Sequence, residues 1–464
     1  MTKWQPDIEN SGVEHYKAIV EAMGRDIASG ALKPGERLPP HRELAHALGL
    51  AVGTVSKAYM EARRRGFIHS RAGSGTFVRE HPLRERRRVR TDREDTGRID
   101  LSFNGPVNAA LHSEALQAAL TKVAASETMA PFLQYHRPWL GHDRHRSAGS
   151  TWIEQFGLKT DMADVAVVSG AQHAASVALI ATATAGDLVV TDELCDPSIR
   201  LLAGALGLNL RGLKADEHGL LPEAFENACQ TEKVKAIICM PDHHSPTLVV
   251  MPEQRRRAIA EIARAHGVTL IENAVYRPFL EAAPPPIASF APEISYYCTS
   301  LSKIIAPGLR IGFLTAPSGK ADELVLGMGA TSWMTPPLIA EVATQWIEDG
   351  TARRLVDWQR TELAERNRMA AEILDGFTCS ALKSGLHIWL QLPDRWRAAT
   401  LAQEARARDV LVTPADAFAI GWVNAPHAVR ISLGGATGRE ALVAGLRIIV
   451  EILGRKVESS YLAI

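Results

Sequence analysis

The stretch Ser295–Leu314 reads SYYCTSLSKIIAPGLRIGFL and decides how the rest of the chain is interpreted. The apolar and aromatic run at its start predicts a buried strand, and a second apolar run follows Arg310. Lys303 stands between the two runs, and an ammonium group is costly to bury unless it has a chemical task. A neutral lysine amine forms a Schiff base with a carbonyl cofactor, so we expect Lys303 to be a catalytic Schiff-base residue.

Polar groups around this lysine indicate which cofactor it binds. Ser300, Ser302 and Arg310 are hydroxyl and guanidinium groups of the kind that hold a phosphate. A lysine that forms a Schiff base, next to groups that bind phosphate, indicates the cofactor pyridoxal 5'-phosphate. The alternative interpretation is that Lys303 is a lysine in a surface loop. The stretch resembles the lysine motif of fold-type I aminotransferases, S-x-S-K-x-x-x-P-G-x-R, and every fixed position of that motif is present.

Composition limits the classes of protein to consider. A chain of 464 residues with 46% hydrophobic residues predicts two or three globular domains. Five scattered cysteines without metal-ligand spacing, and an N-terminus without a signal sequence, predict a cytoplasmic protein with reduced thiols. The adjacent His243 and His244 face opposite ways in a strand, so we expect no metal site.

Charge is distributed unevenly along a chain that is neutral as a whole. Residues 1–98 carry 19 Lys and Arg against 13 Asp and Glu, whereas the remaining residues carry 33 against 39. A basic front end on an acidic body indicates a nucleic-acid partner.

Residues 1–78 have the pattern of a small DNA-binding domain. Helical spacing of apolar residues predicts helices over 14–29, 41–48 and 52–65, and two strand-like pieces flank a glycine-rich turn over 71–75. This order predicts a helix-turn-helix with a two-stranded wing, in which the later helix enters the major groove.

The same segment resembles the GntR-type winged helix-turn-helix. The motifs are S-G-x-L-x-P-G-x-x-L-P-x-x-R-x-L-A from Ser29, G-T-V-x-x-A-Y from Gly53 and R-x-G-S-G-T-F-V from Arg71. A winged helix used only for protein contacts is the alternative. Basic and hydroxyl side chains suit phosphate contacts. By resemblance, the DNA-binding residues are Arg42, Thr54, Ser56, Lys57, Arg71, Gly73, Gly75 and Thr76.

Residues 79–98 are predicted to be an Arg-rich linker. Eight arginines and five acidic residues occur there without a helical stripe. Such a run is usually a solvated tether, and phosphate contact by Arg86–Arg88 is the alternative.

From residue 99 to 464 the pattern predicts an α/β domain. Short β-branched runs alternate with Ala- and Leu-rich helical segments, which predicts a mostly parallel sheet covered on both faces. A long helix over 336–367 and a smaller α/β piece follow. The resemblance to the aminotransferases implies the pyridoxal-phosphate-dependent transferase fold of type I for this domain.

A glycine turn at 167–172 joins a predicted strand to an Ala-rich helix, whose free amide groups favour a phosphate. By resemblance, Gly170, Ala171 and Gln172 bind the cofactor phosphate. Tyr135 resembles the tyrosine that reaches the phosphate across a dimer interface in these enzymes, and a core or interface aromatic residue is the alternative.

The segment Ile271–Tyr276 departs from the aminotransferase pattern E-D-x-x-Y. The resemblance implies that Tyr276 bonds the cofactor's ring hydroxyl and that Asn273 occupies the position of the Asp that pairs with the ring nitrogen. A neutral amide does not stabilise a pyridinium charge. Glu272 points to the opposite face of a strand, so we do not expect it to substitute. We therefore expect only residual transaminase activity.

Two further positions concern a small-molecule ligand. Ser245 occupies the place of the usual cofactor-binding Asn, and Asp196 stands where a Tyr is common. Arg430, alone in the apolar run 428–433, resembles the arginine that binds a substrate carboxylate bidentately. An arginine on a surface strand is the alternative.

The two halves together resemble the MocR/PdxR-type regulators, a GntR winged helix fused to an aminotransferase-like domain. The resemblance implies a homodimer that binds two half-sites of double-stranded DNA and senses a small amine, an amino acid or the cofactor itself. A working aminotransferase acting on an amino acid is the first alternative. A DNA-binding protein whose large domain only dimerises, without cofactor, is the second.

Overall fold

The computed structural model describes residues 4–7, 15–28, 30–33, 35–64, 67–71, 75–78, 97–126, 138–421 and 425–454. The chain forms two compact units, one within residues 1–94 and the other from residue 95 onward. None of the helices within the described ranges is long and apolar enough to cross a membrane.

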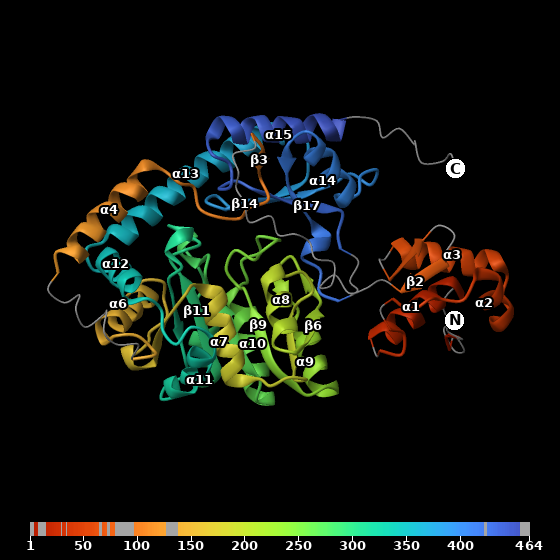
Figure 1. Ribbon diagram of the computed structural model, residues 1–464, viewed down its shortest axis with the longest axis horizontal. Helices are drawn as coiled ribbons and strands as arrows, with labels where there is room; N and C mark the ends of the chain where they lie inside the picture. The colour runs from red at the N-terminus through yellow and green to blue at the C-terminus, as the bar shows by residue number, and fades with distance from the viewer. Residues whose placement is uncertain are drawn as a thin grey trace. The chain divides into compact units, whose positions relative to one another are not determined.

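The described part of the first unit contains three helices and a two-stranded wing (Figure 1). The helices are α1 (His15–Ala28), α2 (His41–Leu48) and α3 (Val52–Arg64), and β1 (Ile68–Arg71) pairs antiparallel with β2 (Gly75–Val78). Gly49 ends α2 in the left-handed conformation at φ 64°, which a side chain rarely adopts. The buried side chains that hold these elements together include Ile19, Met23, Leu44, Val55, Tyr59 and Phe67.

The second unit is built on a seven-stranded sheet with the order β4-β12-β11-β10-β9-β5-β6. Only β12 runs antiparallel to its neighbours, so the predicted mostly parallel sheet is confirmed. The strands are β4 (Val165–Val168), β5 (Leu188–Asp192), β6 (Asn209–Leu213), β9 (Val234–Cys239), β10 (Thr269–Asn273), β11 (Ser295–Ser300) and β12 (Gly312–Thr315).

Helices cover both faces of this sheet, as β4 illustrates. Val165 and Val167 join the core that includes α6 (Asp143–Glu154), whereas Ala166 and Val168 join the core that includes α7. Successive strand residues point to opposite faces, so both faces are apolar and both are packed. The helices that follow in the chain are α7 (Ala171–Thr182), α8 (Pro197–Ala205), α9 (Pro222–Thr231), α10 (Glu253–His266) and α11 (Leu324–Thr331).

A smaller antiparallel sheet, in the order β13-β14-β17-β16, forms the C-terminal part of this unit. The helices α13 (Thr351–Ile373), α14 and α15 lie beside it (Figure 1). β15 (Val410–Leu411) pairs parallel with β3 (Ile99–Asp100), which ties the start of the unit to its end. The remaining bounds are α4 (Ala110–Ala124), β7 (Ala215–Asp216), β8 (Gly219–Leu220), β13 (Cys379–Ser380), β14 (His387–Gln391), α14 (Ala398–Ala407), β16 (Thr413–Pro414), β17 (Ala428–Ser432) and α15 (Arg439–Gly454).

The prediction of a single helix over 336–367 is wrong. Two helices occupy this region, α12 (Pro337–Glu348) and α13 (Thr351–Ile373). Gly350 adopts the left-handed conformation at φ 76°, and Asp349 accepts a hydrogen bond from the Thr351 amide at 2.9 Å. The apolar spacing continues through this break, which is why periodicity alone misses it.

A buried ion cluster joins β9, α10 and the turn after β10. The Asp242 carboxylate accepts one hydrogen bond from Arg256 at 2.7 Å and another from Arg277 at 2.9 Å. Arg256 also donates to the carbonyl oxygens of Met251 and Pro241, at 2.8 and 3.1 Å. A buried charge is tolerable only with such full pairing, so this cluster fixes the loop that follows β9.

Candidate functional site

Lys303 lies directly after β11, at the carboxyl edge of the sheet. Its ammonium nitrogen donates a hydrogen bond of 2.9 Å to the backbone oxygen of Asn104 and lies 6.0 Å from the centre of the Phe103 ring. The side chain is half-buried rather than free in solvent. This position disagrees with the alternative of an unconstrained surface lysine.

Asn104 connects Lys303 to Tyr276. The Asn104 side-chain nitrogen donates to the Tyr276 hydroxyl oxygen at 3.0 Å, and Tyr276 is almost fully buried. The buried Asn104 side-chain oxygen has no hydrogen-bond partner among the described residues. The sequence interpretation missed Asn104, although the Asn-Gly-Pro turn over 104–106 marks a break after an apolar run.

A cradle formed by Gly170 and Arg310 lies at the start of α7. Gly170 precedes the helix at φ 87° and ψ 170°, and a Cβ atom added there would lie 3.2 Å from the Arg310 guanidinium. Arg310 donates to the Ser169 carbonyl oxygen at 3.1 Å, so its charge is held beside the helix N-terminus. The first amide groups of a helix have no intrahelical acceptor, so Ala171 and Gln172 offer donors here.

Ser300 and Ser302 lie beside this cradle but bond to the backbone of Ile311. Both hydroxyl groups donate to the Ile311 carbonyl oxygen, at 2.8 and 3.3 Å. The Ile311 amide donates back to the Ser302 hydroxyl oxygen at 2.9 Å. Both serines therefore hold the lysine turn closed, and their predicted role as phosphate ligands stays a prediction.

The end of β10 places Glu272 and Asn273 on opposite sides of the strand. The Glu272 carboxylate accepts a hydrogen bond from the Ala288 amide at 2.8 Å, and the Asn273 side-chain oxygen accepts one from the Val275 amide at 3.3 Å. Burial, helped by the nearby Asp242, raises the pKa of Glu272 to about 7. Glu272 is thus directed away from Asn273, as the strand alternation predicts.

Arg430 on β17 is buried at the other side of the site. It donates to the Ser245 hydroxyl oxygen at 3.2 Å and to the Ser102 carbonyl oxygen at 3.0 Å, and its guanidinium lies 4.8 Å from the Phe418 ring centre. Its Nε group has no hydrogen-bond partner among the described residues. Desolvation by burial lowers the pKa of Arg430. A buried guanidinium with an unused donor suits a carboxylate ligand.

The remaining departures have structural roles. Asp196 caps α8, because its carboxylate accepts a hydrogen bond of 3.0 Å from the Ser198 amide. His244 bonds to the Thr247 hydroxyl group at 2.7 Å. Within the described ranges, no group of three or more His, Cys, Asp or Glu side chains is placed to hold a metal ion. Tyr135 lies outside the described residues.

In the first unit, the predicted DNA-binding side chains differ in how they are held. Arg42 is exposed on α2. On α3, the Ser56 hydroxyl group bonds to the His41 ring at 3.0 Å, and the Lys57 ammonium lies 3.9 Å from the centre of the Tyr16 ring. The Lys57 charge is therefore partly satisfied within the protein.

The other predicted DNA contacts lie on or near the wing and α3. Thr54 is half-buried on α3, while Gly75 and Thr76 belong to β2. A Cβ atom at Gly75 would lie 2.8 Å from the Arg37 side chain, so glycine lets the wing pack closely. The Arg71 backbone pairs with Gly75, and Gly73 lies outside the described residues.

Family models match both parts of the chain. The model "Aminotransferase class I and II" matches residues 96–446, and the model "Bacterial regulatory proteins, gntR family" matches residues 15–78.

Relatives that cover both parts are regulators by name. An uncharacterized HTH-type transcriptional regulator of Bacillus subtilis, YdeF, is 29% identical over 97% of this chain and 96% of its own length. The pyridoxine biosynthesis transcriptional regulator PdxR of Corynebacterium glutamicum is 26% identical over 80% of this chain and 81% of its own.

Solved structures confirm the fold of the larger unit. An archaeal alanine:glyoxylate aminotransferase superposes with a TM-score of 0.70 at 18% identity, covering 77% of this chain and 90% of its own. Kynurenine aminotransferase of Pyrococcus horikoshii gives a TM-score of 0.70 at 21% identity, covering 82% and 96%.

The fold and the lysine after β11 define a fold-type I, pyridoxal-phosphate-type transferase domain. The chain belongs to the aminotransferase class I and II family. With its GntR helix-turn-helix, it has the architecture of the MocR-type regulators, which confirms the resemblance found in the sequence.

Proposed function

We propose that the protein is a DNA-binding transcription regulator whose larger domain binds pyridoxal 5'-phosphate and senses an amino-group ligand or the cofactor itself. The observation that carries this proposal is the union, in one chain, of a GntR helix-turn-helix with an aminotransferase domain that keeps its lysine. Relatives matching nearly the full length are named as HTH-type regulators, which supports it.

The larger unit offers a separate group for each part of the cofactor. When bound, pyridoxal phosphate supplies a reactive carbonyl and an electron-withdrawing ring. Lys303 presents its amine, and Asn104 orients both that amine and the Tyr276 hydroxyl group. Further residues proposed to hold the cofactor are Gly170, Ala171, Gln172, Arg310, Asn273, Ser245, Ser300, Ser302 and Tyr135.

Arg430 defines the kind of ligand. Its buried guanidinium faces Ser245, and its Nε–H has no partner among the described residues, so it suits a carboxylate. Together with an amine-reactive cofactor, this favours a small amino acid over a simple amine. A ligand switches the protein only if it binds two conformations with different affinity.

The DNA-binding arrangement follows from symmetry. We propose a homodimer, whose two winged helices bind two half-sites of a double-stranded operator. Domain boundaries at residues 78 and 98, with an Arg-rich linker between them, belong to this proposal.

The test measures DNA binding and cofactor binding on the full-length chain. The fragment upstream of its own gene is titrated by fluorescence anisotropy, with and without pyridoxal phosphate and a panel of amino acids. We expect a salt-dependent complex whose affinity changes at least about threefold with one of these compounds, about 0.65 kcal/mol. No change in anisotropy with this fragment under any of these conditions would refute the proposal of a regulator.

A working aminotransferase is the competing function, and Asn273 argues against it. A neutral amide leaves the cofactor's ring nitrogen without an anionic partner. We expect Asn273→Asp to raise the rate of half-transamination of bound cofactor at least about tenfold, that is by about 1.4 kcal/mol. If the native chain already transaminates amino acids as fast as that variant, the catalytic function is correct.

A further inference from the structure

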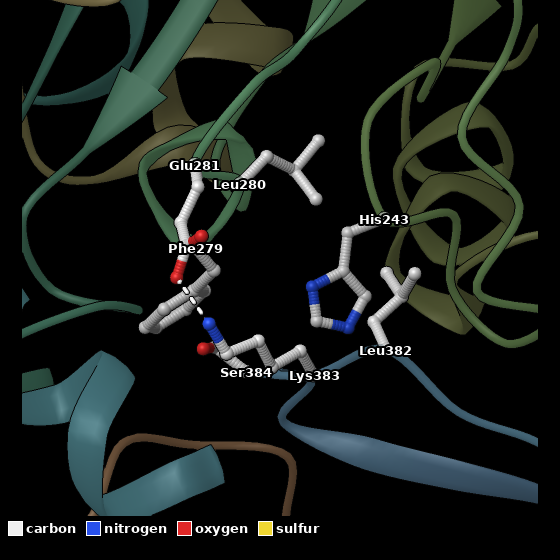
Figure 2. A pocket seen from close by; sticks show the side chains of 7 residues that line it. All are labelled: His243, Phe279, Leu280, Glu281, Leu382, Lys383 and Ser384. Atoms are coloured by element: carbon white, nitrogen blue, oxygen red, sulfur yellow. Dashed lines mark hydrogen bonds and ion pairs between the residues drawn. The ribbon is translucent and has the colours of Figure 1, made fainter.

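A cavity lies between the turn after β10 and the segment before β14. Its volume is about 150 Å³, and Figure 2 shows its side chains. The residues that line it are His243, Phe279, Leu280, Glu281, Leu382, Lys383 and Ser384. None of them belongs to the residues proposed to hold the cofactor.

His243 is one of the polar residues that line this cavity, with Glu281, Lys383 and Ser384. It is fully buried, and neither ring nitrogen has a hydrogen-bond partner among the described residues. Figure 2 shows its imidazole directed into the space across from Glu281 and Lys383. Its backbone lies at φ 53°, a conformation maintained only where the surroundings impose it.

Burial also keeps this imidazole neutral, since it lowers the pKa of His243 to about 3. A neutral imidazole has one N–H donor and one nitrogen acceptor. Two unused hydrogen-bonding groups in a buried position cost free energy unless an occupant bonds to them.

The rest of the cavity wall offers no free charge. Phe279, Leu280 and Leu382 are apolar, and the Lys383 ammonium pairs with the Glu281 carboxylate at 2.9 Å. A charged ligand buried beside His243 would remain unpaired next to a neutral histidine, which is unfavourable. The wall therefore suits a neutral molecule with an apolar body.

Size limits the occupant further. An apolar cavity of about 150 Å³ accommodates a molecule the size of benzene. We propose that this cavity binds a neutral small molecule of about six to eight non-hydrogen atoms, whose hydroxyl or primary amide group exchanges hydrogen bonds with His243. The centre of the His243 ring lies 5.1 Å from that of Tyr276, so the cavity shares a wall with the cofactor site.

The experiment compares phenol with toluene, two probes with the same number of non-hydrogen atoms that differ by a hydroxyl group in place of a methyl group. Binding to the full-length chain is measured by ligand-observed NMR and calorimetry. We expect phenol to bind at least about tenfold more tightly than toluene, because only phenol satisfies the imidazole.

Two variants locate the binding. His243→Phe keeps a ring but removes both nitrogen atoms, so the preference for phenol is expected to disappear. Leu382→Trp fills the cavity, so both probes are expected to lose binding at least about tenfold, and circular dichroism verifies that each variant is folded. No binding of phenol to the native chain at millimolar concentration would overturn the proposal. Unchanged phenol binding in folded Leu382→Trp would also overturn the proposal. This second test can be read even if His243→Phe does not fold.

Discussion

The two units of the molecule carry their functional groups in opposite ways. In the helix-turn-helix unit, Arg42 and Lys57 lie at the surface, where duplex DNA is the partner proposed for them. In the aminotransferase unit, Ser300 and Arg430 are buried and already bonded to other parts of the protein. A charged group at the surface can still bind an external partner. A buried polar group already forms hydrogen bonds within the protein, and these bonds stabilise the fold. This difference ranks the expected effects of substitution.

The largest effect is expected at Lys303, where substitution should abolish covalent attachment of the cofactor completely. Treating cofactor-loaded protein with borohydride should fix the cofactor to one lysine, detected by peptide mass spectrometry. We expect Lys303→Ala to abolish this label, because its amine is the one placed beside Asn104 and Tyr276. Lys320→Ala, an exposed lysine of the same unit, is the control and should keep the label. A label on another lysine in the native chain would contradict the site.

Neighbouring arginines on α10 sharpen the contrast between buried and exposed charge. Arg256 is fully buried against Asp242, whereas Arg257 forms an exposed pair with Glu253. We expect Arg256→Met to lower the free energy of unfolding by about 3 kcal/mol, because it leaves a buried carboxylate underpaired and the Met251 carbonyl oxygen without its side-chain donor.

Arg257→Met is the matched control, and we expect little measurable change from it because exposed ion pairs contribute little. Urea unfolding followed by circular dichroism measures both. Equal losses in the two variants would show that burial does not determine the effect of removing a charge here.

The sequence predicted the helices and strands well where their positions depend on a local pattern of residues. The helix predicted over 41–48 ends at Gly49, and the alternation of β-branched runs with helical segments predicts the sheet that is packed on both faces. The motif around Lys303 also places that lysine at the end of a buried strand. These features depend on neighbours in the chain, which a sequence displays directly.

The contacts that the sequence did not predict join residues far apart in the chain. Asn104 contacts Lys303 and Tyr276, and Arg430 bonds to Ser245, across separations of more than 170 residues. Ser300 belongs to a motif predicted to bind phosphate, but its hydroxyl group donates to the Ile311 carbonyl oxygen. Only the fold determines which of several acceptors a hydroxyl group reaches. The motif therefore does not predict the contact that Ser300 makes in the structure.

Glu272 provides a pH test of the buried unit. Its pKa rises from 4.5 to about 7 in the folded protein, so the native state holds the proton more tightly than the unfolded chain. The resulting stabilisation is present below pH 4.5 and is lost as the pH rises through 7. We expect the native chain to lose on the order of 2 kcal/mol relative to Glu272→Gln between pH 5 and 8.

The measurement is urea unfolding at each pH, and Glu253→Gln, at an exposed position, is the control that should follow the native curve. Parallel curves for Glu272→Gln and the native chain would mean that Glu272 is ionised in the folded state throughout this range.

The smallest effect is expected at the surface of the helix-turn-helix unit, where it separates Arg42 from Lys57. Binding to a random-sequence duplex is measured by fluorescence anisotropy at several salt concentrations. We expect Arg42→Ala to reduce the slope of log K against log salt by about 0.9, as one phosphate contact does. Lys57→Ala should reduce it less, because the ammonium already lies 3.9 Å from the Tyr16 ring centre. Lys320→Ala should leave the slope unchanged, since Lys320 belongs to the other unit. If Lys57→Ala reduced the slope as much as Arg42→Ala, its contact with Tyr16 would not compete with DNA, and both charges would act as free surface groups.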